Sequence, residues 1–386
     1  MDQRVNELLF ALLRFAIRGE NLTEREQEAL REEGLSSLAQ LARKHDLVHL
    51  VAFALKQAGL IGEGHELCKD MLLVAVRYEQ LNHMLLKLCR ALEGARISFM
   101  PLKGSVIRKY YPEPWMRTSC DVDVLVHEED AERASEILVE QCGYIRGGKT
   151  SHDITLFAKN GMHAELHYDL VEEGLAARSA EVLHLVWDTA TVRDGQEYWY
   201  EMPDETFYFY HVAHMAKHFE NGGCGIRPFI DLWILDNLEG VDVSKRDRLL
   251  EQGGLGGFAE ACRKLSRVWF DREATDDLSR QMEAYLLYGG VYGATENRIA
   301  VGQQKKGGTL RFAISRIFLP YEVIQFHYPI LQKHRWLLPV MQVRRWGKLI
   351  FRGGFGRGVK ELRYNQSLDE TKARDTANML RDIGLL

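Results

Sequence analysis

The chain has few cysteines, and their spacing follows no pattern. Only six of its 386 residues are cysteines, and no two of them form a C-x-x-C pair: Cys68, Cys89, Cys120, Cys142, Cys224 and Cys262. Structural zinc sites and disulfide frameworks both depend on closely or regularly spaced cysteines. The sequence therefore favours neither, and we expect reduced thiols that are mostly buried.

A long apolar run is also missing. No stretch approaches the roughly 20 apolar residues of a membrane-spanning helix, and the charged start at residues 1 to 4 is not followed by the apolar segment of a signal peptide. Neither sign of charge is in excess, because 50 basic residues stand against 55 acidic ones and give a formal net charge of −5. We therefore expect a cytoplasmic protein without membrane contact, and any surface that binds nucleic acid has to be local.

Acidic residues lie inside an apolar run at residues 121 to 126, with the sequence DVDVLV. Side chains alternate between the two faces of a strand, so Asp121 and Asp123 share one face and the valines share the other. Two neighbouring carboxylates repel each other unless a cation lies between them, so a divalent metal is the simplest interpretation. The alternative is that both acids only flank the solvent edge of a strand.

A glycine and a serine precede this strand at a predicted helix start. Gly104 and Ser105 follow a predicted strand at 97–102 and lead into a predicted helix at 106–110. A small residue at such a start exposes backbone N–H groups to an anion, and the serine hydroxyl adds a donor. Phosphates beside metal-binding carboxylates indicate phosphoryl or nucleotidyl transfer.

A third carboxylate follows in a predicted hairpin. Asn160-Gly161 is a two-residue signal for a tight turn between strands. The second strand alternates so that His163, Glu165 and His167 share a face. Glu165 therefore completes the aspartate pair if the two strands are neighbours in the sheet.

These motifs together resemble a known family. Lys103-Gly104-Ser105, Tyr111-Pro112, Arg117, Asp121-Val122-Asp123 and Glu165-Leu166-His167 are similar to the uncharacterised nucleotidyltransferase family within the DNA polymerase beta-like superfamily. The resemblance extends to residues 92–97, to residues 214–218, and to Arg227 and Asp231, and so covers most of the chain. It departs in one respect, because residues 106–120 form a longer gap between Ser105 and Asp121 than is usual in the superfamily.

The resemblance implies transfer of a nucleoside monophosphate from an NTP, with ATP as the first candidate, to an acceptor hydroxyl on a small molecule, a protein or RNA. Asp121 and Asp123 would bind the Mg²⁺ that grips the triphosphate, and with Glu165 they would hold a second Mg²⁺, with Mn²⁺ as the alternative metal. Nucleotide-binding roles are implied for Gly104, Ser105, Lys103, Arg117, Lys217 and Arg227. Supporting roles are implied for His167, His214 and Asp231, the last two by holding two helices together. Lys217 and Arg227 could instead be a solvated lysine and a helix-terminal arginine.

The periodicity predicts helices up to residue 95, strands alternating with helices to about residue 188, and helices again beyond. We expect an α+β fold in which a small mixed β-sheet is flanked by N-terminal and C-terminal helical domains. The expected segments are an N-terminal helical domain at 1–95, the nucleotidyltransferase core at 96–190, a helical domain contacting the nucleotide site at 191–288, and a C-terminal helical extension with a basic surface at 289–386. Residues 289–308 predict a loop or linker. An apolar stripe from Leu73 to Leu92 predicts a packing face on a helix, and not a coiled coil.

Two other functions stay open. Residues 331–364 gather basic side chains among aromatic ones, namely Lys333, Arg335, Arg344, Arg345, Lys348, Arg352, Arg357, Lys360 and Arg363 with Trp336, Trp346, Phe351 and Phe355. A catalytically silent module that binds RNA or a protein partner there is one alternative, although a solvated helix face gives the same pattern. A metal phosphohydrolase built on His211, His214 and His218 is the other.

Overall fold

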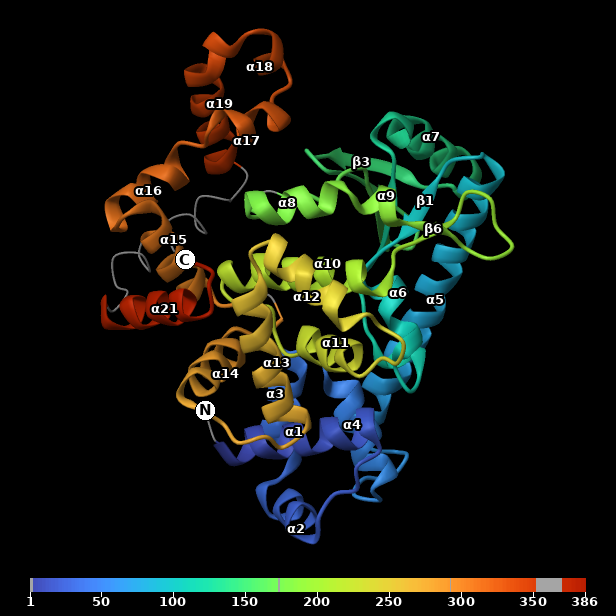
Figure 1. Ribbon diagram of the computed structural model, residues 1–386, viewed down its shortest axis with the longest axis vertical. Helices are drawn as coiled ribbons and strands as arrows, with labels where there is room; N and C mark the ends of the chain where they lie inside the picture. Colours follow the sequence, from blue (N-terminus) through green and yellow to red (C-terminus); the bar gives the residue numbers. More distant parts are fainter. Residues whose placement is uncertain (1–2, 173, 292, 352–369) are drawn as a thin grey trace.

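The computed structural model describes residues 3–172, 174–291, 293–351 and 370–386. A small β-sheet lies among helices, with the N-terminal helices at one end of the long axis and a group of C-terminal helices at the other (Figure 1). The predicted α+β fold is confirmed. The described cysteines carry free thiols, as expected, but only Cys89, Cys224 and Cys262 are buried, and Cys120 is exposed.

The sheet has five strands in the order β1-β2-β5-β4-β3. They are β1 (Phe99–Pro101), β2 (Asp121–Val126), β3 (Ile145–Lys149), β4 (Asp153–Phe157) and β5 (His163–His167). β2 and β5 pair in parallel, whereas the other pairs are antiparallel, so the sheet is mixed as predicted. The parallel pair brings residues about 40 positions apart side by side.

One face of this sheet is apolar. Val122, Val124 and Val126 of β2 are buried with Ala164 and Leu166 of β5 against α5 (Glu66–Gly94) and α7 (Ala131–Cys142). The intervening residues of both strands point to the opposite face, which faces α10 (Asp204–Glu220). The period-two alternation therefore separates the apolar residues from the acidic ones, as the sequence predicts.

The stripe on α5 packs only in its second half. Leu85 and Leu92 are buried, but Leu73 and Val76 are 67% and 48% exposed. The predicted packing of the stripe was wrong at these two residues, because periodicity specifies a helix face and not what covers it.

The hairpin between β4 and β5 has a longer loop than predicted. The N–H of Ala158 donates to the carbonyl of Met162 (2.7 Å), and the N–H of Gly161 donates to the carbonyl of Ala158 (3.0 Å). Gly161 has φ +83°. This is a three-residue loop that ends in a left-handed glycine, so the Asn-Gly pair marks the turn but not its two-residue form.

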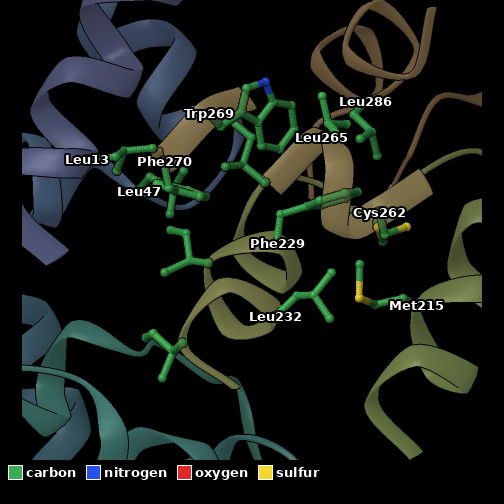
Figure 2. Packing of buried hydrophobic residues seen from close by; sticks show 14 of the residues in the cluster. Leu13, Leu47, Met215, Phe229, Leu232, Cys262, Leu265, Trp269, Phe270 and Leu286 are labelled. Atoms are coloured by element: carbon green, nitrogen blue, oxygen red, sulfur yellow. The ribbon is translucent and has the colours of Figure 1, made fainter. Parts of the chain in front are cut away.

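The N-terminal helices share one hydrophobic core with helices from the second half of the chain. They are α1 (Gln3–Arg18), α2 (Glu24–Glu33), α3 (Leu35–Lys44) and α4 (Val48–Gln57), packed with α10, α11 (Arg227–Asp236), α12 (Val243–Gln252), α13 (Gly256–Phe270) and α14 (Asp277–Gly289). Phe10 stacks on Trp269 with ring centroids 4.6 Å apart, and Leu13 and Leu47 lie beside Phe270 (Figure 2). The division into four segments stays a prediction.

Residues 289–308, predicted as a loop, contain helix α15 (Thr295–Lys306). Ile299, Ala300 and Val301 are buried, and α15 packs on α21 (Glu370–Asp382). The Asn297 side chain donates to the carbonyls of Gly222 and Tyr285, both at 3.2 Å. Tertiary contacts to distant helices stabilise this polar segment, and local sequence does not contain them.

The other described elements are short or lie at the C-terminal end. They are α6 (Gly104–Ile107), η1 (Arg108–Tyr110), η2 (Pro114–Met116), η3 (Glu128–Asp130), α8 (Ala177–His184), α9 (Val186–Thr189), β6 (Thr191–Val192), β7 (Tyr200–Glu201), α16 (Thr309–Ile317), α17 (Tyr321–His327), α18 (Ile330–Lys333), η4 (Arg335–Leu337) and α19 (Leu338–Phe351). Within the described part of the chain, none of the helices combines the length and the apolar character needed to cross a bilayer.

Several residues of the predicted basic surface have partners within the C-terminal helices. Arg335 lies over Tyr321 and Arg344 over Tyr328, at 4.2 and 5.7 Å from the ring centroids. Arg345 donates to the carbonyl of Ile317 at 2.9 Å. Arg352, Phe355, Arg357, Lys360 and Arg363 lie outside the described residues.

Candidate active site

The parallel pairing of β2 and β5 brings the predicted carboxylates together. Asp121 pairs in register with His163, and Asp123 pairs with Glu165. Two groups of three side chains have ligand atoms within 4.8 Å of one another: Asp121 with His163 and Glu165, and Asp123 with Glu165 and His167. Glu165 belongs to both groups, so it lies within reach of both aspartates.

Asp123 has two positively charged or proton-donating partners. Its Oδ1 atom lies 3.0 Å from Lys103 Nζ and 2.9 Å from His167 Nε2. Burial would raise the pKa of Asp123, but Lys103 and His167 hold it below its ordinary value. The His167 hydrogen bond likewise lowers the pKa of Glu165. Both carboxylates are therefore ionised at neutral pH.

Asp121 lacks such compensation. Burial and the charges of Asp123 and Glu165 raise its pKa. Among the described residues its salt-bridge partner is His163, whose Nε2 atom lies 3.7 Å from Asp121 Oδ2, and both side chains are 30% exposed. The unbalanced negative charge of the cluster is therefore on the solvent side of the group, at Asp121.

Lys103 and Gly104 adopt the conformation needed at the end of β1. Lys103 has φ +46° and ψ −123°, a left-handed φ that is uncommon outside glycine. A Cβ atom on Gly104 would lie 3.1 Å from Ser119 Cβ and 3.6 Å from Arg117 Nη1. A side chain at 104 would crowd this turn. The N–H of Ser105 donates to the carbonyl of Leu102 (3.1 Å). The hydroxyl is therefore the group of Ser105 that can bind a ligand.

Arg117 lies in a buried network that also contains Tyr111 and Asp231, here called the Arg117 network. The Nε and Nη2 atoms of Arg117 donate to the two carboxylate oxygens of Asp231, both at 2.7 Å. The Tyr111 hydroxyl donates to Asp231 Oδ1 at 2.6 Å. Asp231 is 0% exposed. Burial by itself would raise the pKa of Asp231, but Arg117 holds this pKa below its ordinary value. Asp231 thus joins α11 to the segment after α6, and not to another helix through His214.

Arg227 lies beside this network. Its Nη1 atom donates to Asp46 Oδ2 at 2.9 Å and to Thr118 Oγ1 at 2.8 Å. Arg117 Nη1 donates to the carbonyl of Thr118. Both arginines therefore hold the chain immediately before β2, and Arg117 also borders Gly104.

Helix α10 presents polar side chains to the carboxylate face. Lys217 forms an ion pair with Glu172, and His214 Nε2 lies 3.1 Å from His218 Nε2. Burial and the positive charge of Lys103 hold the pKa of His214 well below its ordinary value. Burial also lowers that of His218, to about 4. Both imidazoles are neutral at physiological pH.

The third histidine of this helix turns elsewhere. His211 Nε2 bonds the carbonyl of Pro228 at 3.0 Å and so links α10 to α11. In the described ranges, the groups of three or more residues with metal-ligand geometry both lie on β2 and β5, and none includes His211, His214 or His218. The geometry gives no support to a phosphohydrolase centred on α10.

Sequence reasoning assigned no role to three residues of this region. Arg108 donates to the carbonyl of Gly104 (2.7 Å) and to Ser119 Oγ (2.8 Å) and so holds the turn at Gly104. Glu172 pairs with Lys217. His163 had a usable signal, because it is two positions before Glu165 on the same strand face. Arg108 and Glu172 had none in the local sequence.

The donor set fits a divalent cation. Carboxylate oxygens suit Mg²⁺ and Mn²⁺, and imidazole nitrogen suits transition metals. The cluster contributes three carboxylates, whereas the basic groups in direct contact with it are Lys103 and the two histidines. Asp121, Asp123 and Glu165 would hold the ions, with His163 and His167 beside them.

Acidic side chains converge from two adjacent parallel strands of a small mixed sheet, and a Gly-Ser turn precedes the first of these strands. This arrangement is typical of the class of nucleotidyltransferases that the motifs indicated. The family model described as uncharacterised nucleotidyltransferase matches residues 31–271, and the chain belongs to that family. The match runs from the last residues of α2 to the residue after α13 and includes the whole site. No curated protein and no solved structure matches the chain.

Proposed function

We propose that this transferase is metal-dependent and moves a nucleoside monophosphate from an NTP, with ATP as the first candidate, to an acceptor hydroxyl. The main support is that Asp121, Asp123 and Glu165 lie together on β2 and β5, with Glu165 in both ligand groups. Bringing three carboxylates together next to one lysine, with Asp123 buried, is unfavourable without further cations. Mg²⁺ or Mn²⁺ bound there would neutralise the triphosphate and lower the pKa of the acceptor hydroxyl.

Glu165 is the proton acceptor in this proposal. The acceptor oxygen attacks the α-phosphorus of the NTP, the bond from that phosphorus to the bridging oxygen breaks, and pyrophosphate leaves. The proton of the acceptor hydroxyl goes to a Glu165 carboxylate oxygen. His167 lowers the pKa of Glu165 by its hydrogen bond at 3.4 Å, so this oxygen is unprotonated at neutral pH.

The residues of the Gly104 turn and of α10 bind the triphosphate. The Gly104 N–H and the Ser105 hydroxyl contact the β- and γ-phosphates, and Lys103 and Lys217 supply positive charge. Arg117 and Arg227 add charge from the side of Thr118 while they hold the segment before β2. His167 orients Asp123 and Glu165, Asp231 holds Arg117, and His214 lies 3.9 Å from Glu172.

The acceptor is a hydroxyl of a small molecule, a protein or RNA, and the decisive experiment identifies it. The protein is incubated with each α-labelled NTP, Mg²⁺ or Mn²⁺, and a cell lysate, and the labelled product is analysed. We expect labelling that requires the metal and is lost in Asp121→Asn and Glu165→Gln. Asp70→Asn is the matched control, because Asp70 pairs with Arg43 on α3 and lies outside the site. Labelling that survives both active-site changes would contradict the proposal.

A binding measurement separates this proposal from the silent module. Thermal stabilisation by an NTP that needs a divalent cation and disappears in Asp121→Asn is expected of the enzyme. Salt-sensitive RNA binding that is indifferent to that change is expected of the module.

A further inference from the structure

The two aspartates of the cluster have different surroundings. Asp123 is 4% exposed and has Lys103 Nζ and His167 Nε2 at hydrogen-bond distance. Asp121 is 30% exposed, and an imidazole is its neighbour in register on β5. A cation would therefore displace Lys103 at Asp123, whereas at Asp121 it would meet an uncompensated carboxylate.

We propose that the two sides of the cluster bind metal unequally: Asp121, His163 and Glu165 hold a resident ion with the His163 imidazole as a ligand, and Asp123 keeps the Lys103 ammonium as its counter-ion until nucleotide arrives. This inference rests on the proposed function, since it divides the same site into two parts.

The geometry supports His163 as a ligand. Its Nε2 atom is 3.7 Å from Asp121 Oδ2, and the ligand atoms of Asp121, His163 and Glu165 all lie within 4.8 Å of one another. Ligands of one first-row ion at about 2.0–2.2 Å would be separated by distances of this order.

The ligand types predict the class of metal. Mg²⁺ prefers oxygen ligands alone, whereas imidazole favours the transition metals. One imidazole with two carboxylates therefore selects Mn²⁺, or a later divalent metal of that row, over Mg²⁺. On the Asp123 side, the imidazole of the second ligand group, His167, already forms a hydrogen bond to Asp123 through Nε2 at 2.9 Å, so it does not supply this preference.

The test measures Mn²⁺ binding to the whole protein without nucleotide. Calorimetry should show a single tight Mn²⁺ ion per chain, and electron spin echo envelope modulation of that ion should show a coordinated nitrogen. In His163→Asn the nitrogen signal should disappear and the Mn²⁺ affinity should fall by about tenfold or more, with a smaller change for Mg²⁺. His184→Asn is the matched control, because its side chain is 60% exposed outside the cluster.

A second variant tests the role of Lys103. Lys103→Met removes the ammonium next to Asp123, so a second Mn²⁺ ion should bind without nucleotide. If the stoichiometry is unchanged, Lys103 does not hold that position and this half of the inference is wrong.

The outcomes separate this inference from the proposed function. No nitrogen signal in the wild-type protein, or a signal that persists in both His163→Asn and His163→Gln, overturns the role of His163. Transfer that still depends on Asp121 and Glu165 would then leave the proposed function intact. Conversely, nitrogen coordination by His163 without transfer from any NTP would contradict the proposed function and not the metal site.

Discussion

The carboxylate cluster and the Arg117 network lie on either side of the same Gly104 turn, and both bury charge. In the Arg117 network, Asp231 is fully buried, but Arg117 and Tyr111 satisfy both of its oxygens. In the cluster, three carboxylates share Lys103 and two histidines, and within the described residues Asp121 has only His163, at 3.7 Å, as a salt-bridge partner. Charge that the protein itself balances stabilises a structure, whereas charge left unbalanced favours binding of a cation.

The largest expected effect comes from removing the unbalanced charge. Asp121→Asn should lower the transfer rate by about a thousandfold or more while leaving the melting temperature equal or higher, because it relieves repulsion from Asp123 and Glu165. The measurement is the initial rate of labelled-NTP transfer beside a thermal melt.

Asp123→Asn gives the contrast within the cluster. It should also abolish transfer, but it leaves Lys103 and His167 without their carboxylate and should lower the melting temperature. Equal stability of the two variants would mean that the cluster is not divided as the contacts indicate.

The balanced network should behave in the opposite way. Arg117→Ala leaves Asp231 as a buried unpaired charge and should reduce the free energy of unfolding by about 3–5 kcal/mol. Arg43→Ala is the control, since it removes an arginine from an exposed pair with Asp70 and should cost about 1 kcal/mol or less. Urea denaturation measures both. A small loss in Arg117→Ala would show that the network does not brace the fold.

His45 shows a third way to bury a titratable group, which is to keep it neutral. It is fully buried, and burial lowers its pKa to about 4. The unfolded state takes up this proton near pH 6.5, so it binds more protons than the folded state between pH 6.5 and 4. The free energy of unfolding should therefore decrease as the pH is lowered from 6.5 to 4, by up to about 1.4 kcal/mol per pH unit.

His45→Gln removes that proton uptake, so the free energy of unfolding should depend less on pH between 6.5 and 4. His184→Gln, an exposed site, should leave the dependence unchanged. Denaturant titrations at several pH values make the comparison, and equal slopes in wild type and His45→Gln would contradict it.

The smallest expected effect lies at an exposed polar network. Thr23 and Glu26 form a capping box at the start of α2. Thr23→Ala should reduce stability by about 1 kcal/mol without any effect on transfer, and Thr23→Ser should restore most of it. A loss as large as that of Arg117→Ala would remove the distinction between buried and exposed networks.

Local sequence was sufficient where one short segment contains the whole cause of its structure. The residues of β2 alternate between acid and valine, and the strand has the predicted bounds, residues 121 to 126. The capping box of α2 is equally local, because Thr23 and Glu26 are three residues apart. Local sequence was not sufficient at α15, where buried contacts to α21 outweigh a polar, glycine-bearing sequence.

The sequence by itself determined the acidic face of β2, the three carboxylates and the Gly-Ser turn, because alternation and turn chemistry depend on neighbours along the chain. Only the tertiary structure decided that β2 lies parallel to β5, that Lys103 reaches Asp123 and not Asp121, and that Arg117 is paired with Asp231. These contacts join residues between 20 and 114 positions apart, and no local pattern specifies which distant partner a buried charge finds.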